Sequence, residues 1–158
     1  MADLKRALAS VAEVFQIRAF NQHQEAAIRT IVEEKKDAFV NLPTGFGKSL
    51  IYQALPLVFD RLYTSEQGHI VIVVSPLINL IQDQVMQLKK LDITAINISA
   101  VDNEEEKKDV EKGKFSVVYG TPEAWLLNER WRSMLTNSTY SKNVCAIAVD
   151  EAHVIKQW

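Results

Sequence analysis

The sequence predicts an α/β fold in which a parallel sheet lies between two layers of helices. Short apolar runs alternate with segments of helical periodicity along the 158 residues, and this order favours parallel strands with right-handed connections. The runs are rich in β-branched residues, as is typical of strands buried on both faces. Polar motifs directly follow several of these runs, at the strand ends where open parallel sheets bind ligands.

The individual elements follow from apolar spacing, capping residues and turn residues. Helices are expected over residues 3–15, 22–34, 48–63, 78–91, 102–112 and 122–135. Strands are expected over 38–40, 69–74, 93–98, 115–119 and 144–149, the last of them buried. A polar loop is expected over 137–143. Because there are no repeats, low-complexity tracts or linkers, these elements are predicted to form one domain.

Composition limits the possible classes of protein. The net charge is −2, so no broad positive field indicates a nucleic-acid partner, and any such binding has to be local. The single cysteine, Cys145, excludes a disulfide framework and favours a reducing compartment. No apolar run reaches the length of a membrane span, and the amino terminus lacks a secretory signal pattern. We expect a soluble protein of the cytoplasm or nucleus without a membrane partner.

The stretch NLPTGFGKSL, Asn41–Leu50, is typical of a phosphate-binding loop between a strand and a helix. Gly45 and Gly47 permit a tight turn whose backbone N–H groups surround phosphate oxygens. Lys48 then reaches the β- and γ-phosphates, and the Ser49 hydroxyl binds Mg²⁺. The nucleotide-binding residues expected here are Pro43, Thr44, Gly45, Phe46, Gly47, Lys48 and Ser49. The alternative is a chance glycine-rich turn, which the strand before it and the helix after it disfavour.

An acidic pair follows the last predicted strand. Asp150 is positioned to hold Mg²⁺ opposite Ser49, and Glu151 to orient or deprotonate an attacking water. Acidic residues often end strands, so the catalytic interpretation depends on the phosphate loop earlier in the chain. His153 either couples this site to a neighbouring domain or is merely packed in a loop.

A glutamine near the start of the second helix has two interpretations. The Gln24 amide both donates and accepts hydrogen bonds, so it can bind the edge of adenine. Alternatively, Gln24 is a solvated residue of the first helical turn. The position of Gln24 ahead of the phosphate loop favours the interpretation that it binds adenine.

Together these motifs resemble those of superfamily 2 helicases, and in detail those of the RecQ family of DNA helicases. The matching stretches are Phe20 with Gln24, Leu42–Leu50, Tyr52–Gln53, Ser75–Val85, Tyr119–Glu123, Asp150–His153, and Ile155, Gln157 and Trp158. DEAH-type RNA helicases share the four letters of Asp150–His153, but not SPLxxLxxDQV or the QW that follows.

The resemblance implies a RecA-like P-loop NTPase domain over residues 1–158, with the adenine-binding motif in the helices of residues 1–35. It also implies that ATP and Mg²⁺ drive 3′-to-5′ unwinding of DNA, as in DNA repair and recombination. Lys48, Asp150, Glu151 and His153 would be catalytic. The nucleic-acid contacts that it implies are Ser75, Pro76, Leu77, Asn79, Gln82, Thr121 and Trp158.

The chain departs from the family pattern at several positions. Ile17 and Asn21 stand where an aromatic residue and an arginine usually flank adenine, and Arg18 is a substitute that can stack. The other departures are Phe46, Val154 and Lys156. The chain is expected to lack the final strands of its own sheet, which leaves an exposed edge. It also ends before the second RecA-like domain and its arginine finger, which is worth ~10³–10⁵ in rate in related enzymes. We therefore expect weak nucleotide binding and no unaided unwinding.

Two other functions remain open. One is an RNA helicase or translocase of the same superfamily, and the other is a non-catalytic module that binds nucleotide, DNA or a partner. Intact Lys48, Ser49, Asp150 and Glu151 argue against a degenerate site.

Overall fold

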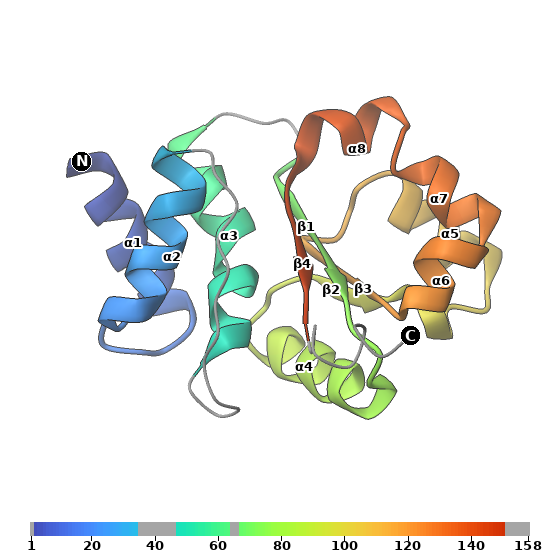
Figure 1. Ribbon diagram of the computed structural model, residues 1–158, viewed down its shortest axis with the longest axis horizontal. Helices are drawn as coiled ribbons and strands as arrows, with labels where there is room; N and C mark the ends of the chain where they lie inside the picture. Colours follow the sequence, from blue (N-terminus) through green and yellow to red (C-terminus); the bar gives the residue numbers. More distant parts are fainter. Residues whose placement is uncertain (1, 35–46, 64–66, 151–158) are drawn as a thin grey trace. The chain divides into compact units, whose positions relative to one another are not determined.

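A computed structural model describes residues 2–34, 47–63 and 67–150. The chain forms two compact units, Met1–Thr64 and Ser65–Trp158, and each is described by itself (Figure 1). The strand predicted at 38–40 lies outside the described residues.

The first unit contains the helices α1 (Ala2–Val14), α2 (Gln22–Glu33) and α3 (Lys48–Leu62). Each of the three confirms a predicted helix. Helix α3 contacts both α1 and α2. The apolar spacing of α1 and α2 buries Val11 and Ile28 completely, as a helical period that keeps one face apolar requires.

The second unit contains a parallel sheet. Its strands are β1 (Ile70–Val74), β2 (Ala95–Asn97), β3 (Val117–Gly120) and β4 (Val144–Val149), in the spatial order β2-β3-β1-β4. Ile96, Val118 and Ile72 lie opposite one another in adjacent strands and therefore point to the same face. The predicted parallel sheet is confirmed.

Helices cover both faces of this sheet (Figure 1). On one face, Ile72 and Val118 pack in a buried cluster with residues of α5 (Glu104–Glu111), α6 (Pro122–Leu127), α7 (Glu129–Met134) and α8 (Ser138–Asn143). On the other face lies α4 (Ile78–Lys90), where the Tyr119 hydroxyl donates to Gln84 Oε1 at 2.7 Å. The predicted α/β class is confirmed.

In two segments the helices differ from the predictions. The single helical segment expected over 122–135 is wrong, because the extended Asn128 (φ −92°, ψ 113°) separates α6 from α7 and accepts a hydrogen bond from Trp131 N. The polar loop expected over 137–143 is also wrong. There Asn137 caps α8, which buries Tyr140 completely.

The last strand is less buried than predicted. In β1, Ile72 is 1% exposed, whereas its partner Ile147 in β4 is 62% exposed and Val149 is 51% exposed. Both strands are apolar runs, so composition predicts the strand correctly but not which of its faces is covered.

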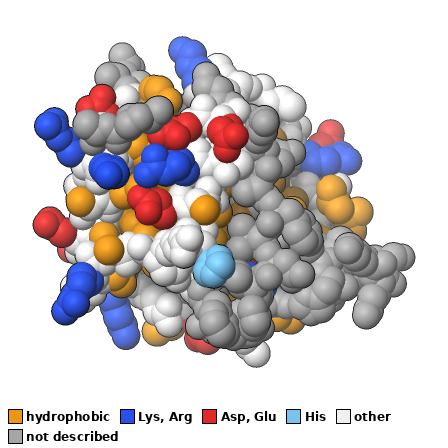
Figure 2. Space-filling model, turned by 60° about the vertical axis from the view of Figure 1, so that its left-hand side comes forward, with side chains coloured by type: hydrophobic (Ala, Val, Ile, Leu, Met, Phe, Trp, Pro, Cys, Tyr) orange, Lys and Arg blue, Asp and Glu red, His pale blue; other side chains and the backbone are white. Residues whose placement is uncertain are grey.

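Charged side chains are mixed by sign on the surface in Figure 2. On α2, for example, Arg29 forms ion pairs with both Glu25 and Glu33. Within the described ranges, none of the helices combines the length and the apolar character that a bilayer crossing needs.

Candidate nucleotide and nucleic-acid site

In the first unit, Gln24 joins the start of α2 to the end of the phosphate loop. Its Oε1 accepts from Asn21 N at 2.9 Å, while Asn21 Oδ1 accepts from Gln24 N at 2.8 Å. Gln24 Nε2 donates to the Gly47 carbonyl at 3.3 Å, and the side chain is buried. The alternative in which Gln24 is solvated is therefore wrong. Asn21, a departure from the family pattern, is the residue that caps α2.

Glycine is required at position 47 for two reasons, its backbone conformation and the closeness of a neighbouring side chain. Its φ of 75° lies in the left-handed region, and a Cβ there would lie 2.5 Å from Gln24 Nε2. This glycine precedes Lys48 and Ser49, the first two residues of α3, and both are partly exposed. The side chains predicted to bind phosphate and Mg²⁺ thus begin a helix directly after a left-handed turn.

In the second unit, the residues after the strands form a continuous polar edge, which we call the carboxyl edge: Ser99, Thr121, Ser75 and Asp150. Asp150 N donates to the Val74 carbonyl at 2.9 Å, and Ser75 N donates to the Gly120 carbonyl at 3.0 Å. Thr121 N donates to Ser99 Oγ at 3.0 Å. These bonds confirm that three of the four predicted motifs follow the carboxyl ends of strands, side by side.

Further contacts fix the turn from β3 into α6. Thr121 Oγ1 accepts from Ala124 N at 3.2 Å, and Trp125 Nε1 donates to the Val73 carbonyl at 3.2 Å. A Cβ on Gly120 would lie 2.5 Å from Trp125 Nε1 and 2.9 Å from Ile98 Cγ1. The turn is therefore packed against both neighbouring strand ends.

The predicted nucleic-acid residues after β1 differ in accessibility. Ser75 is 2% exposed, and its hydroxyl accepts from Leu77 N at 3.4 Å. Pro76 is partly exposed, whereas Leu77, Asn79 and Gln82 are exposed. A strand bound here would meet the exposed first turns of α4, while Ser75 shapes the turn beneath them.

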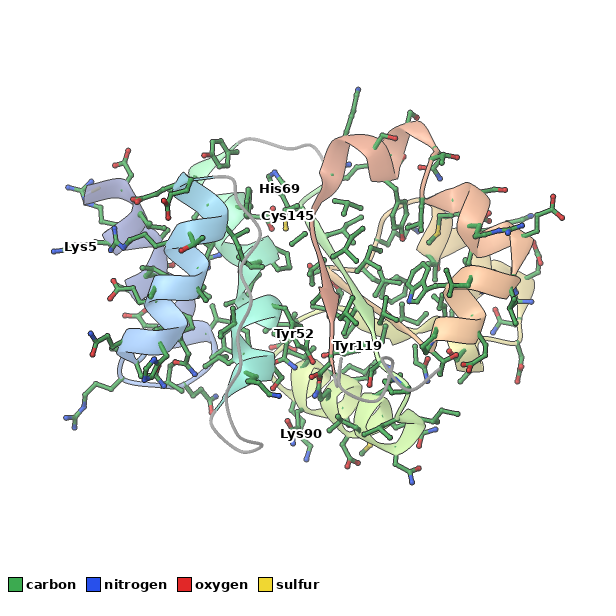
Figure 3. The ribbon with its side chains drawn as sticks, in the orientation of Figure 1. Lys5, Tyr52, His69, Lys90, Tyr119 and Cys145 are labelled. Atoms are coloured by element: carbon green, nitrogen blue, oxygen red, sulfur yellow. The ribbon has the colours of Figure 1, made fainter. Side chains whose placement is uncertain are left out.

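Figure 3 shows three further residues of the second unit, Tyr119, His69 and Cys145. Tyr119 points from β3 toward α4. His69 and Cys145 lie together near the amino-terminal ends of β1 and β4, away from the carboxyl edge. The remaining predicted site residues lie outside the described residues: Pro43, Thr44, Gly45, Phe46, Glu151, His153 and Trp158.

The sequence analysis missed two residues at the end of β2, Asn97 and, on the carboxyl edge, Ser99. Asn97 ends β2 and its Oδ1 accepts from Ser99 N at 3.0 Å, which begins the short 3₁₀ helix η1 (Ile98–Ala100). The rule that ligands bind after parallel strands applies to β2 as it does to β1 and β3. This rule predicts a ligand-binding role for Ser99, but no sequence motif contains that residue.

The fold and these strand-end motifs define an α/β class with a phosphate loop and a ligand edge. The model of the DEAD/DEAH box helicase family matches residues 21–158, and the chain belongs to this family.

Curated relatives are similar over most of the chain. It is 37% identical over 152 residues to a putative ATP-dependent DNA helicase Q1 of Caenorhabditis elegans, covering 92% of this chain and 23% of the relative. It is 38% identical over 140 residues to the bifunctional 3′-5′ exonuclease/ATP-dependent helicase WRN of Mus musculus, covering 89% and 9%. The ATP-dependent DNA helicase RecQ of Haemophilus influenzae is 36% identical over 156 residues, covering 96% and 23%.

These matches confirm the predicted resemblance to RecQ-type helicases. The chain spans a quarter of the length of these relatives or less.

Proposed function

We propose that this chain is the first motor domain of an ATP-dependent DNA helicase, which binds ATP–Mg²⁺ and single-stranded DNA. The observation that carries the proposal is the carboxyl edge, where Thr121, Ser75 and Asp150 follow three adjacent strands and are joined by backbone hydrogen bonds. Its membership of a helicase family supports the same function. In the full-length protein, a second RecA-like domain would complete the motor.

In this proposal, the phosphate loop and the residues around it hold the nucleotide. Lys48 binds the β- and γ-phosphates, and loop residues 44–47, after Pro43, surround them with backbone N–H groups. Gln24 binds adenine with the N–H that its bond to Gly47 leaves over, since a primary amide carries two donors.

Ser49 and Asp150 are each suited to bind Mg²⁺, because hydroxyl and carboxylate oxygens are the ligands that Mg²⁺ prefers. When bound, the ion neutralises charge on the phosphate oxygens. Glu151 is assigned to orient or deprotonate the water, and His153 to couple the site to a neighbouring domain. The backbone bond from Asp150 to Val74 fixes where that acidic segment leaves the sheet.

The DNA strand is proposed to lie along the carboxyl edge. Its contacts would be Asn79 and Gln82 on α4, Pro76 and Leu77 before it, and Trp158. Ser75 and Thr121 are largely buried, so they hold the turns that meet the strand. Such contacts to the phosphate backbone give affinity without sequence preference.

A nucleotide-binding measurement on the 158-residue chain tests the motor assignment. We expect Lys48→Ala to weaken binding of a fluorescent ATP analogue with Mg²⁺ by about tenfold or more, since hydrogen bonds to charged groups contribute about 1.5–3 kcal/mol. Lys5→Ala, which alters an exposed lysine of α1, is the matched control. Equal binding by both variants would contradict the assignment.

The nucleic acid is tested with matched single strands of DNA and RNA. We expect DNA to bind more tightly than RNA. We also expect the 158-residue chain alone to leave duplexes intact, because unwinding is proposed to need a second RecA-like domain. A preference for RNA would favour the RNA helicase. Strand separation by the chain alone would refute the expected dependence on a second domain.

A further inference from the structure

The two outer strands of the sheet differ in length and in how far they are covered. Strand β2, on one side, has three residues, Ala95–Asn97, and all three are buried. Strand β4, on the other side, has six residues, and its Ile147 and Val149 are 62% and 51% exposed. Among the described strands, β4 is therefore the one beside which a further strand fits.

The backbone of β4 presents hydrogen-bonding groups to this outer side. Asp150 N donates to the Val74 carbonyl of β1 at 2.9 Å. The N–H and C=O groups of successive residues in a strand point to opposite sides, so those of Ile147 and Val149 point away from β1. The same two residues carry the exposed apolar side chains. An added strand would therefore gain backbone hydrogen bonds and apolar contacts at the same positions.

The sequence of β4 lacks the usual protection of an outer strand. Charged side chains, proline or a bulge discourage such a strand from pairing with another chain. The sequence of β4 is VCAIAV, which contains neither a charge nor a proline. The irregularity in its register lies at its beginning, opposite Ile70 and Val71, and not at Ile147. The middle and the end of β4 are thus open to pairing.

The charges that flank β4 favour one orientation of a partner strand. Lys142, two residues before the strand, is exposed, and Asp150 directly follows the strand. When two copies of β4 pair antiparallel, the Lys142 end of each lies beside the Asp150 end of the other. Parallel pairing would bring like charges together, which is destabilising. In the antiparallel orientation, β4 is therefore complementary to a second copy of itself.

We propose that β4 is a self-association surface, through which two copies of the chain pair antiparallel about a twofold axis and form one continuous sheet. At the axis Ile147 lies opposite its counterpart in the second copy, and the two residues exchange both backbone hydrogen bonds. The contact closes at two copies, because it uses both β4 strands and leaves only the short, buried β2 on the outside. It does not depend on the proposed motor function.

The test is sedimentation equilibrium of the 158-residue chain over a range of concentrations. We expect a reversible monomer–dimer equilibrium. Ile147→Lys should weaken dimerisation at least about tenfold, because a lysine on an outer strand opposes pairing. Met86→Lys changes an apolar residue of α4 that is similarly exposed, at 59%, and as the matched control it should leave dimerisation unchanged.

Two further measurements test the orientation and the location of the contact. Lys142→Glu should weaken dimerisation about threefold to tenfold, since it places like charges at both ends of the antiparallel pair. In the dimer, the backbone amides of Ile147 and Val149 should gain protection from hydrogen exchange as the concentration rises.

A chain that stays monomeric at every concentration would refute the proposal, as would a dimer that Ile147→Lys and Met86→Lys weaken equally. Circular dichroism verifies that each variant is folded. If Ile147→Lys unfolds, Lys142→Glu decides, and dimerisation that this variant leaves unchanged counts against the antiparallel pair. Association that continues beyond two copies would exclude the twofold arrangement.

Discussion

The two ends of the β2–β3 pair carry the same hydrogen-bond arrangement with different surroundings. At the amino ends, Thr94 and Ser116 join the strands by a hydroxyl pair and one backbone donor. At the carboxyl ends, Ser99 and Thr121 repeat both bonds. Both ends are also bonded to β1, because Ser116 O accepts from Val71 N at 2.9 Å and Gly120 O accepts from Ser75 N at 3.0 Å.

The difference shows that chemistry alone does not mark a site. In a parallel sheet all carboxyl ends meet at one edge, so turns from several strands present their polar groups together there. The amino-end pair lies at the opposite edge of the sheet, where the sequence analysis predicted no ligand-binding motif. We expect changes at the amino end to alter stability only, and changes at the carboxyl end to alter stability and binding.

The largest effect on stability is expected when one glycine near each end of β3 is replaced by alanine. Gly120→Ala would place a Cβ 2.5 Å from Trp125 Nε1, and Gly113→Ala would place one 2.7 Å from Thr139 Cγ2 at a φ of +79°. Each should cost about 1–3 kcal/mol in the free energy of unfolding, measured by denaturant titration. Only Gly120→Ala should also weaken binding of single-stranded DNA. Equal loss of binding in both variants would contradict the comparison.

A smaller effect is expected from Tyr140→Phe. The buried Tyr140 hydroxyl donates to the Val110 carbonyl at 2.6 Å, and burial raises the pKa of this phenol, so it remains a neutral donor. Its loss should cost about 1 kcal/mol, because Val110 keeps the Gly113 N–H as a donor. Thermal unfolding measures the change, and DNA affinity should stay the same.

A gain in stability is expected at the loop that leads to Thr94. Asp92 has a φ of 60° after α4, where its N–H donates to the Lys89 carbonyl and Ile93 N donates to Leu88. Glycine adopts this conformation without strain, so Asp92→Gly should stabilise the chain by about 0.5–1 kcal/mol. Chemical denaturation checks the sign, and a destabilised variant would show that the Asp92 side chain stabilises the turn.

The smallest effect is expected from removal of an exposed ion pair between α5 and α7. Arg130 of α7 contacts both carboxylate oxygens of Glu104 on α5, at 2.8 Å and 2.9 Å. The hydrogen bond from Arg130 lowers the pKa of Glu104 from its usual value. The stabilisation is therefore present above the unfolded pKa and is lost as pH falls through the folded value.

Glu104→Gln should accordingly reduce the loss of stability between about pH 5 and about pH 3, measured by thermal unfolding at each pH. Because the pair is exposed, added salt should weaken it. An unchanged pH profile in this variant would show that the pair contributes nothing.

Several elements could be predicted from the sequence because their signals are local. Asn103, followed by three glutamates, predicted the start of α5, and Pro122 predicted that of α6. The β-branched run at Ile70–Val74 predicted a buried strand. Such features depend on backbone propensity and capping within a few residues, so the local sequence contains them.

Other features depended on partners distant in the sequence. The helix α8 was missed because Tyr140, which anchors it, bonds to Val110 thirty residues away. The prediction that β4 is buried was wrong, because an apolar run does not show which segments pack against it. Ser99 was missed for the same reason, since its partner Thr121 is 22 residues away.

The sequence by itself determined the phosphate-loop motif, the order of strands and helices, and the positions of the polar motifs after three strands. Only the tertiary structure decided which of those strand ends are joined, that Ser75 and Thr121 are buried while Ser99 is exposed, and that Gln24 is bonded to Gly47. The physical reason is range: turns and caps are fixed by neighbours in the chain, whereas burial and hydrogen bonding of a side chain depend on the segments that folding brings beside it.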